Sequence, residues 1–296
     1  NLIIEGRTNS SNLPTLATGS YYIDNQVNSG SMLFFDIDIQ KFSNNGSLIW
    51  STYFGGNDNE SLSANPGSFF PFNDGCAVDG CGNIYISFST RSSNMTTVDG
   101  GCQGFLDNDL SNFNDCFIAE FKKHGQLTWS SYFGGYSNPY TNYYYNAVHG
   151  MCLAIDKKNN IMATGVSQSS VGFTFVQYGT AYFDNSNSTP GDQEPFILKF
   201  KQPDFNANVN YTHCTTGCTG TATVTINTTC PGSYTYNWSS GQTTQTVNNL
   251  CNGSYSVIVK DTSTGCRIDT VSFTMAQGLN INPVISASSC PFTCDG

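Results

Sequence analysis

Three histidines, His124, His149 and His213, supply all the imidazole groups with which this chain could catalyse acid–base reactions. Hydrolytic catalysis requires a nucleophile beside a base, or two carboxylates at a fixed separation, and none of the three lies in such a motif. His124 precedes Gly125 in a predicted turn, and His149 precedes Gly150 in a tyrosine-rich stretch, so we expect structural roles for both. No catalytic residue is predicted.

A second chemistry that these residue types could support is zinc binding. His213, Cys214 and Cys218 resemble half of a zinc site, because imidazole and thiolate groups are the usual zinc ligands. The cysteines of the matching segment 290–294 have the same spacing but no histidine before them. Disulfides explain both cysteine pairs, and no metal ligand is assigned.

Calcium is the third chemistry to consider. The segment 107–115, Asp-Asn-Asp-Leu-Ser-Asn-Phe-Asn-Asp, offers the hard oxygen ligands of a calcium loop. It lacks the glycine and the distal glutamate of an EF-hand, so a polar turn is the preferred interpretation. Calcium remains the alternative, and we expect no other cofactor.

The composition indicates which elements position these residues. The chain has 296 residues, of which 38% are hydrophobic, 14% aromatic and 11% charged, and this balance is typical of a folded protein rather than a disordered one. Asn, Ser and Thr are abundant and helix-favouring residues are scarce, which predicts an all-β fold. The net charge of −10 argues against a nucleic-acid partner, since few basic groups could neutralise phosphates.

Twelve cysteines without a CxxC…CxxC pattern favour an oxidising, extracellular location. No run of 18 apolar residues is present, so no membrane span is expected. The first residues have the pattern of a strand and not of a signal peptide, so we expect the chain to be a piece of a longer exported polypeptide.

Internal repeats organise residues 1 to 203. Three segments start with similar strands, at Asn1, Asn83 and Asn160, and each runs into a Ser-Ser pair. A second block ends at Phe42, Phe121 and Phe200, with an even spacing of 79 residues. The first two repeats also share the block Leu-x-Trp-Ser-x-Tyr-Phe-Gly-Gly, which ends at Gly56 and Gly135.

Each repeat contains about four short strand-like runs separated by Gly, Asn and Asp turn signals, which is the pattern of a β-propeller blade. The recurring blocks resemble the SBBP family of bacterial β-propeller repeats. That resemblance implies a secreted or surface-attached protein, and an architecture rather than a reaction. Propellers need about four to eight blades, whereas this chain supplies about two and a half, so further blades are expected upstream.

The aromatic residues divide into repeated and non-repeated ones. Trp50, Tyr53 and Phe54 recur 79 residues later, which is how residues packed between neighbouring blades behave. Tyr143, Tyr144 and Tyr145 do not recur, so they are the candidate surface contacts, for instance for stacking on sugars.

A different module starts near Phe205. Apolar residues alternate with polar ones over 221–226, 234–238, 255–259 and 271–275, which predicts a small antiparallel, immunoglobulin-like sandwich. The run from Leu250 to Tyr255 has the pattern of a tyrosine corner. This module resembles the gliding-adhesin (SprB-like) repeat of Bacteroidota surface proteins, and a second such repeat starts at Leu279. The resemblance implies type IX secretion, gliding motility, and tandem repeats that form stalks or fibres.

The expected fold is therefore all-β: a partial β-propeller of about two and a half four-stranded blades over 1–203, a sandwich repeat over 204–278, and the start of a second one over 279–296. We expect a non-enzymatic structural, adhesive or filament-forming segment of a large extracellular cell-surface protein. A glycan-binding or glycan-cleaving propeller is the alternative. The surface target, a glycan or a protein, is left open, and a homo-oligomer or filament is a further hypothesis.

Disulfides are the chemistry that the cysteines define best. Cys102 and Cys116 flank one insertion of the second repeat, which predicts a local staple. In an immunoglobulin-like sandwich the connections bring Cys218, or its neighbour Cys214, close to Cys251, and we predict the pair Cys218–Cys251. For Cys266, sandwich geometry favours Cys230, whereas the pattern of the gliding-adhesin family favours Cys214, and the sequence leaves both pairings open.

Overall fold

The computed structural model describes the chain over residues 1–16, 35–60, 75–100, 106–110, 115–134, 148–156, 159–167, 194–200, 205–214, 217–228, 232–262 and 268–276. Within these ranges every regular element is a β-strand, so the expected all-β class is confirmed. None of the described residues forms a helix long and apolar enough to cross a membrane. The chain divides into two compact units, Asn1–Gln202 (unit 1) and Pro203–Gly296 (unit 2), next to the boundary expected at 203/204.

Unit 1 contains three antiparallel sheets, which follow one another along the chain. Sheet I is formed by β1 (Leu2–Thr8), β2 (Asp36–Phe42) and β3 (Leu48–Phe54). Sheet II is formed by β4 (Gly75–Val78), β5 (Ile84–Thr90), β6 (Asp115–Phe121) and β7 (Leu127–Phe133). Sheet III is formed by β8 (Val148–Ile155), β9 (Ile161–Ser167) and β10 (Glu194–Phe200).

The repeated sequence blocks occupy equivalent strands. The blocks that end at Phe42, Phe121 and Phe200 form β2, β6 and β10, and the Trp-Ser-x-Tyr-Phe blocks form β3 and β7. Between β4 and β5, and between β8 and β9, the predicted turns are present. In the first, Asp79 Oδ1 accepts hydrogen bonds from the backbone N–H groups of Cys81 and Asn83, both at 2.9 Å. In the second, Asp156 Oδ1 accepts one from the N–H of Asn160 at 2.9 Å.

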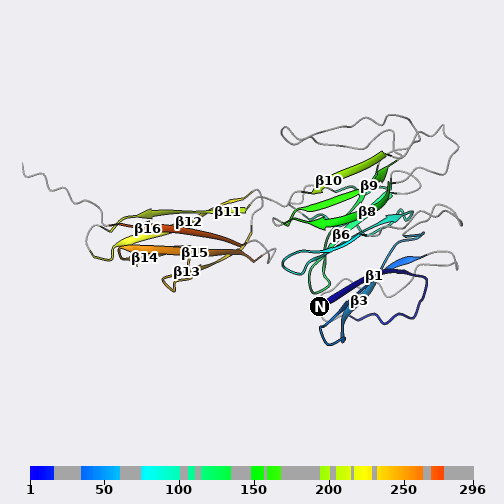
Figure 1. The fold of residues 1–296 in the computed structure, drawn as a ribbon, viewed down its shortest axis with the longest axis horizontal. Coiled ribbons are helices and arrows are strands. Elements are labelled where there is room, and N and C mark those ends of the chain that lie inside the picture. The colour runs from blue at the N-terminus through cyan, green and yellow to red at the C-terminus, as the bar shows by residue number, and fades with distance from the viewer. Residues whose placement is uncertain are drawn as a thin grey trace, which may run out of the picture. The chain divides into compact units, whose positions relative to one another are not determined.

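The three sheets of unit 1 lie one after another in the order of the chain (Figure 1). Apolar side chains pack between neighbouring sheets. Between sheets I and II lies one apolar cluster, which includes Ile37, Ile39, Phe54, Ile86, Phe88 and Phe121. Between sheets II and III lies a second, which includes Tyr85, Ile118, Trp129, Phe133, Ala163 and Phe196. Sheet II is thus covered on both faces, and all seven residues of β5 and of β6 are buried.

The aromatic contacts between sheets recur with the 79-residue spacing of the sequence. The ring centroids of Trp50 and Phe121 are 6.3 Å apart, and those of Trp129 and Phe200 are 5.5 Å apart. Phe54 and Phe117 are separated by 5.8 Å, and Phe133 and Phe196 by 5.9 Å. The interpretation of the repeated Trp and Phe residues as core between neighbouring sheets is confirmed.

Unit 2 contains two antiparallel sheets that share one apolar cluster. The first consists of β11 (Phe205–Thr212), β12 (Gly220–Thr228) and β14 (Thr246–Leu250). The second consists of β13 (Tyr234–Trp238), β15 (Gly253–Asp261) and β16 (Ile268–Met275). The cluster takes side chains from both sheets, among them Ala222, Val224, Leu250, Trp238, Val257 and Val259. The sequence analysis missed β11 and β14, although Phe205, Ala207, Val209 and Tyr211 alternate with asparagine along β11.

Candidate functional site

A group of buried polar side chains lies where sheet I meets sheet II. Asp36 begins β2 and Glu60 follows β3, and both residues have 0% of their surface exposed. Their carboxyl groups lie together over Gly55, the first glycine of the Phe-Gly-Gly motif. A Cβ atom on Gly55 would be 2.6 Å from Asp36 Oδ1 and 2.8 Å from Glu60 Oε2. This joint is the candidate site of the described residues.

Glu60 connects three segments of the joint. Its Oε1 atom accepts hydrogen bonds from Thr90 Oγ1 at 3.0 Å and from Ser92 Oγ at 2.5 Å, both at the end of β5. Its backbone N–H donates to the carbonyl oxygen of Phe35 at 2.8 Å, just before β2. Glu60 therefore ties the end of sheet I to the end of β5 in sheet II.

Burial in this joint changes the acidity of Glu60. The pKa of Glu60 is raised from 4.5 to about 9, mainly because burial removes solvent from the carboxyl group. The neighbouring Asp36 carboxylate contributes to the rise, whereas the hydrogen bonds from Ser92 and Thr90 lower the pKa. Tyr132, on β7, also has its pKa raised to about 12, mainly by burial and in part by the charge of Glu60.

The segment after Phe54 runs closely along the Ser-Ser pair of the second repeat. The N–H of Asn57 donates to Asn94 Oδ1 at 2.7 Å, and the N–H of Asp58 donates to Ser92 Oγ at 2.8 Å. A Cβ atom on Gly56 would be 2.3 Å from the Cβ of Ser92, so this position requires a glycine. The Phe-Gly-Gly and Ser-Ser motifs thus fit each other across the joint.

The tyrosine that precedes the Phe-Gly-Gly motif makes the same pair of hydrogen bonds in sheets I and II. The Tyr53 hydroxyl donates to the carbonyl oxygen of Ser10 at 2.7 Å and accepts from the N–H of Leu13 at 2.9 Å. In sheet II, the Tyr132 hydroxyl donates to Ser92 O at 2.7 Å and accepts from the N–H of Met95 at 2.9 Å. These hydroxyls fix the loops that follow β1 and β5.

The joint contains the groups of a hydrolytic site, but a substrate has no access to them. Ser92 donates to a carboxyl group, as an activated nucleophile does, yet Ser92, Asp36 and Glu60 are all fully buried. A substrate cannot reach them without separation of the two sheets. The arrangement can store a proton and hold the sheets together.

The three histidines considered for catalysis lie on three separate segments of the chain. His124 is exposed in the turn between β6 and β7, where the N–H of Gly125 donates to Lys122 O at 2.7 Å. His213 Nδ1 lies 3.1 Å from the carbonyl oxygen of Ala276. His149 is in β8, and its side chain is outside the description.

Metal sites are not supported in the described ranges. No group of three or more His, Cys, Asp or Glu side chains there is placed to hold a metal ion. In the segment 107–115, Asp107 Oδ1 accepts a hydrogen bond from the N–H of Asp109 at 3.0 Å, as in a polar turn. Asp115 is buried at the start of β6, and residues 111–114 lie outside the description, so the calcium alternative stays a prediction.

The structure confirms one predicted disulfide, Cys218–Cys251, which joins residues 33 positions apart in unit 2. Cys214 is a buried thiol that donates to Leu250 O at 2.9 Å, so the alternative pairing of Cys214 with Cys266 is wrong. The reason is position: Cys214 points into the apolar cluster of unit 2. Cys230 and Cys266 lie outside the described residues, and their pairing stays a prediction.

In unit 1, Cys116 is buried in β6, within the cluster between sheets II and III. Cys102 lies outside the described residues, so the staple between these two cysteines stays a prediction. Cys81, in the turn between β4 and β5, is disulfide-bonded, and the sequence analysis did not anticipate this. Tyr143, Tyr144 and Tyr145, the candidate surface contacts, also fall outside the description.

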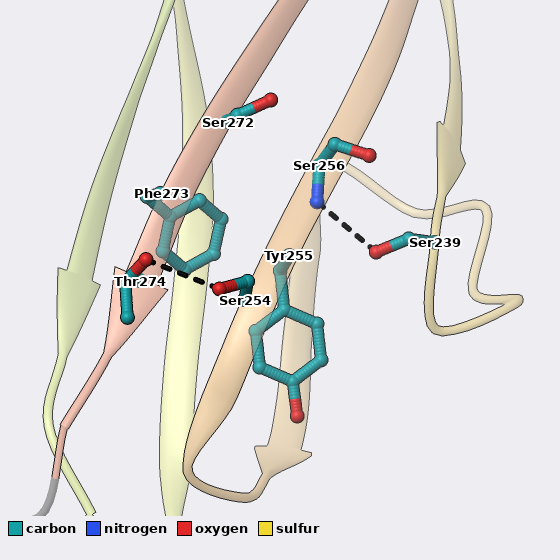
Figure 2. Close-up of a pocket in the computed structure, with 7 residues that line it drawn as sticks. All are labelled: Ser239, Ser254, Tyr255, Ser256, Ser272, Phe273 and Thr274. Atoms are coloured by element: carbon teal, nitrogen blue, oxygen red, sulfur yellow. Dashed lines mark hydrogen bonds between the residues drawn. The ribbon is translucent and has the colours of Figure 1, made fainter.

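A shallow hollow of about 390 Å³ lies on the sheet formed by β13, β15 and β16 (Figure 2). Five of its lining residues carry hydroxyl groups on short side chains, namely Ser239, Ser254, Ser256, Ser272 and Thr274, and the other two are Tyr255 and Phe273. Several of these polar groups already serve the fold. Ser254 Oγ and Thr274 Oγ1 are 3.2 Å apart, and Ser239 Oγ accepts from the N–H of Ser256 at 3.0 Å. No charged group lines the hollow.

Comparison with models of known protein families gave no match. Comparison with curated proteins likewise found no similar protein.

The sequence analysis missed Asp36 and Glu60, but one signal was available. The strands that end at Phe42, Phe121 and Phe200 all begin with an acidic residue, Asp36, Asp115 and Glu194, at the same 79-residue spacing. A repeated acidic residue at the start of a buried strand indicates a shared structural role. Nothing comparable marks Glu60, because its counterpart 79 residues later is Pro139.

Proposed function

We propose that this chain is a non-enzymatic structural and adhesive segment of a large secreted cell-surface protein. In this proposal, sheets I to III are consecutive blades of a β-propeller, and the two sheets of unit 2 are an immunoglobulin-like sandwich repeat.

One observation carries the proposal: the side chains that recur along unit 1 are used to stack sheets. The Trp50–Phe121 and Trp129–Phe200 contacts repeat, as do the Phe54–Phe117 and Phe133–Phe196 contacts. Recurring residues that serve packing favour an architectural role, because each repeat buries its apolar faces only against its neighbours.

The sulfur chemistry supports an extracellular location. Cys218 and Cys251 form a disulfide, and Cys81 takes part in another. Structural disulfides persist in oxidising compartments and are rare in a reducing cytosol. The gliding-adhesin resemblance adds cell-surface attachment after type IX secretion to the proposal.

The experiment is a comparison of binding with turnover. The purified chain is applied to an array of surface glycans and to cells of related and unrelated bacteria, and is incubated with polysaccharides whose reducing ends are counted. The proposal expects no new reducing ends. Release of oligosaccharides that survives purification to homogeneity would contradict the non-enzymatic role and favour a glycan-cleaving propeller.

Self-association is the second part of the test. A structural element of a stalk or filament is expected to form oligomers when several repeats are present in one chain. Light scattering on a longer native chain measures this. A monodisperse monomer at all accessible concentrations would count against the filament form of the proposal while leaving the adhesive form intact.

A further inference from the structure

Asp36 and Glu60 place two carboxyl groups close to each other in a fully buried site. Both residues are fully buried, and the geometry at Gly55 puts Asp36 Oδ1 and Glu60 Oε2 over the same glycine. A hydrogen bond between two such carboxyl groups requires a proton on one of them, because an ionised carboxylate can only accept hydrogen bonds. Two adjacent buried carboxylates would repel each other strongly, so one group stays neutral.

We infer that Asp36 and Glu60 share one proton, so that the joint between sheets I and II is stabilised by acid and weakened by alkali.

The hydrogen-bond pattern of Glu60 leaves one of its two carboxyl oxygens available for a proton. Its Oε1 accepts from Thr90 and Ser92, while within the described residues its Oε2 receives no hydrogen bond. A proton on Oε2 turns this buried acceptor into a donor toward Asp36. Without that proton, the oxygen would be a buried charge with no donor among the described residues, which costs stability.

The charged groups around the pair agree with this assignment. Among the groups that shift the Glu60 pKa, none is a cation, and Asp36 acts in the direction that keeps the proton bound. Tyr132 contributes a neutral hydroxyl, because burial holds its pKa at about 12. Asp58 and Arg91 bond to the joint through their backbone N–H groups, to Ser92 Oγ and to Asn59 O.

The direction of the pH effect follows from proton linkage. In the unfolded chain Glu60 loses its proton near the ordinary glutamate pKa of 4.5, whereas in the folded chain it keeps the proton up to a pKa of about 9. Between these values the folded state binds more protons than the unfolded state, so stability falls as pH rises. The limiting change in the unfolding equilibrium constant is about tenfold per pH unit for one proton. Above the folded pKa this contribution stops changing.

The test is the Glu60→Gln variant of the whole chain. Glutamine keeps the shape of the glutamate side chain. Its oxygen can accept the hydrogen bonds from Thr90 and Ser92, and its NH₂ group can donate a hydrogen bond to Asp36 at every pH. The melting temperature of the native unit 1 is expected to fall between pH 5 and pH 9, and that of Glu60→Gln is expected to change much less. At pH 9 the variant is expected to be the more stable protein.

Glu120→Gln is the matched control, because Glu120 is also buried but is paired with Lys122 at 2.7 Å. It is expected to retain the native slope between pH 5 and pH 9. The same slope in Glu60→Gln as in the native chain would overturn the inference.

A measurement on the native chain does not depend on any variant. The carboxyl carbon of Glu60, followed by NMR, is expected to titrate well above neutral pH. A midpoint below pH 5 would overturn the inference. A rise in native melting temperature with calcium at pH 8 that is absent in Glu60→Gln would also overturn it, since a cation would then neutralise the pair instead of a proton.

Discussion

At the scale of single residues, the Phe-Gly-Gly motif is explained by two carboxyl groups. Gly55 lies against Asp36, and Gly134, its counterpart 79 residues later, lies against Asp115. Both aspartates are buried at the start of the strand that precedes the motif. The glycine is needed for the space that a side chain would occupy, because neither position has a positive φ.

Replacing Gly134 by alanine is therefore expected to destabilise unit 1. The added Cβ would lie 2.0 Å from Asp115 Oδ1, which forces a buried carboxyl group to move. Such overpacking costs about 1 to 3 kcal/mol of the free energy of unfolding. Urea unfolding followed by tryptophan fluorescence measures the change. Gly80→Ala is the control, since nothing lies within 4 Å of a Cβ there, and equal losses in the two variants would contradict the argument.

At the scale of elements, unit 2 shows how one hydroxyl fixes a turn between strands. The Tyr255 hydroxyl donates to the carbonyl oxygen of Cys251 at 3.1 Å and accepts from its N–H at 3.2 Å. This is the tyrosine-corner contact that the run from Leu250 to Tyr255 predicts, and it is confirmed. It holds the connection between β14 and β15, where the chain passes from one sheet to the other.

The Tyr255→Phe variant tests this contact. It removes two backbone hydrogen bonds and keeps the ring that stacks with Phe273 at 5.9 Å. We expect a loss of about 1 kcal/mol in the stability of unit 2, the usual net value for a hydrogen bond. Chemical denaturation measures it. Tyr236→Phe is the control, because the Tyr236 ring packs against the same cluster and its hydroxyl makes no hydrogen bond within the described residues. An equal loss of stability in the two variants would contradict the role of the Tyr255 hydroxyl.

At the scale of the molecule, the chain consists of two compact units with separate apolar clusters. Unit 1 repeats one sheet-to-sheet contact, whereas unit 2 closes a single small core between two sheets. A small domain buries a smaller fraction of its surface on folding, so its stability depends more on cross-links. The Cys218–Cys251 disulfide, which closes a loop of 33 residues, is therefore expected to matter most for unit 2.

Calorimetry of the Cys251→Ser variant tests whether the two units unfold independently. We expect two unfolding transitions in the native chain, and in the variant only the transition of unit 2 is expected to move, with a loss of about 2 to 4 kcal/mol. The variant is preferable to a reductant because Cys81 in unit 1 is also disulfide-bonded. Equal shifts of both transitions would show that the two units do not unfold separately.

The repeats make much of unit 1 predictable from the sequence. Phe42, Phe121 and Phe200 mark equivalent strands, because the blocks that end at these residues recur with a fixed spacing. Recurrence with a fixed spacing also identifies Trp50 and Trp129 as core, since only packing that is the same in each repeat requires the same residue. In unit 2, alternation alone locates four strands, and the run up to Tyr255 locates its corner.

The joint between sheets I and II could not be predicted, because it depends on residues brought together from separate segments. Asp36 and Glu60 are 24 positions apart, and Thr90 and Ser92 lie in another repeat. A carboxyl group in the sequence carries no sign of its burial, and the pKa of Glu60 depends on that burial. The same limit applies to Cys116 and Cys214, which the sequence presents as cysteines like the others. Strand patterns are local and follow from side-chain alternation, whereas proton affinity and thiol pairing depend on distances that only the packed sheets establish.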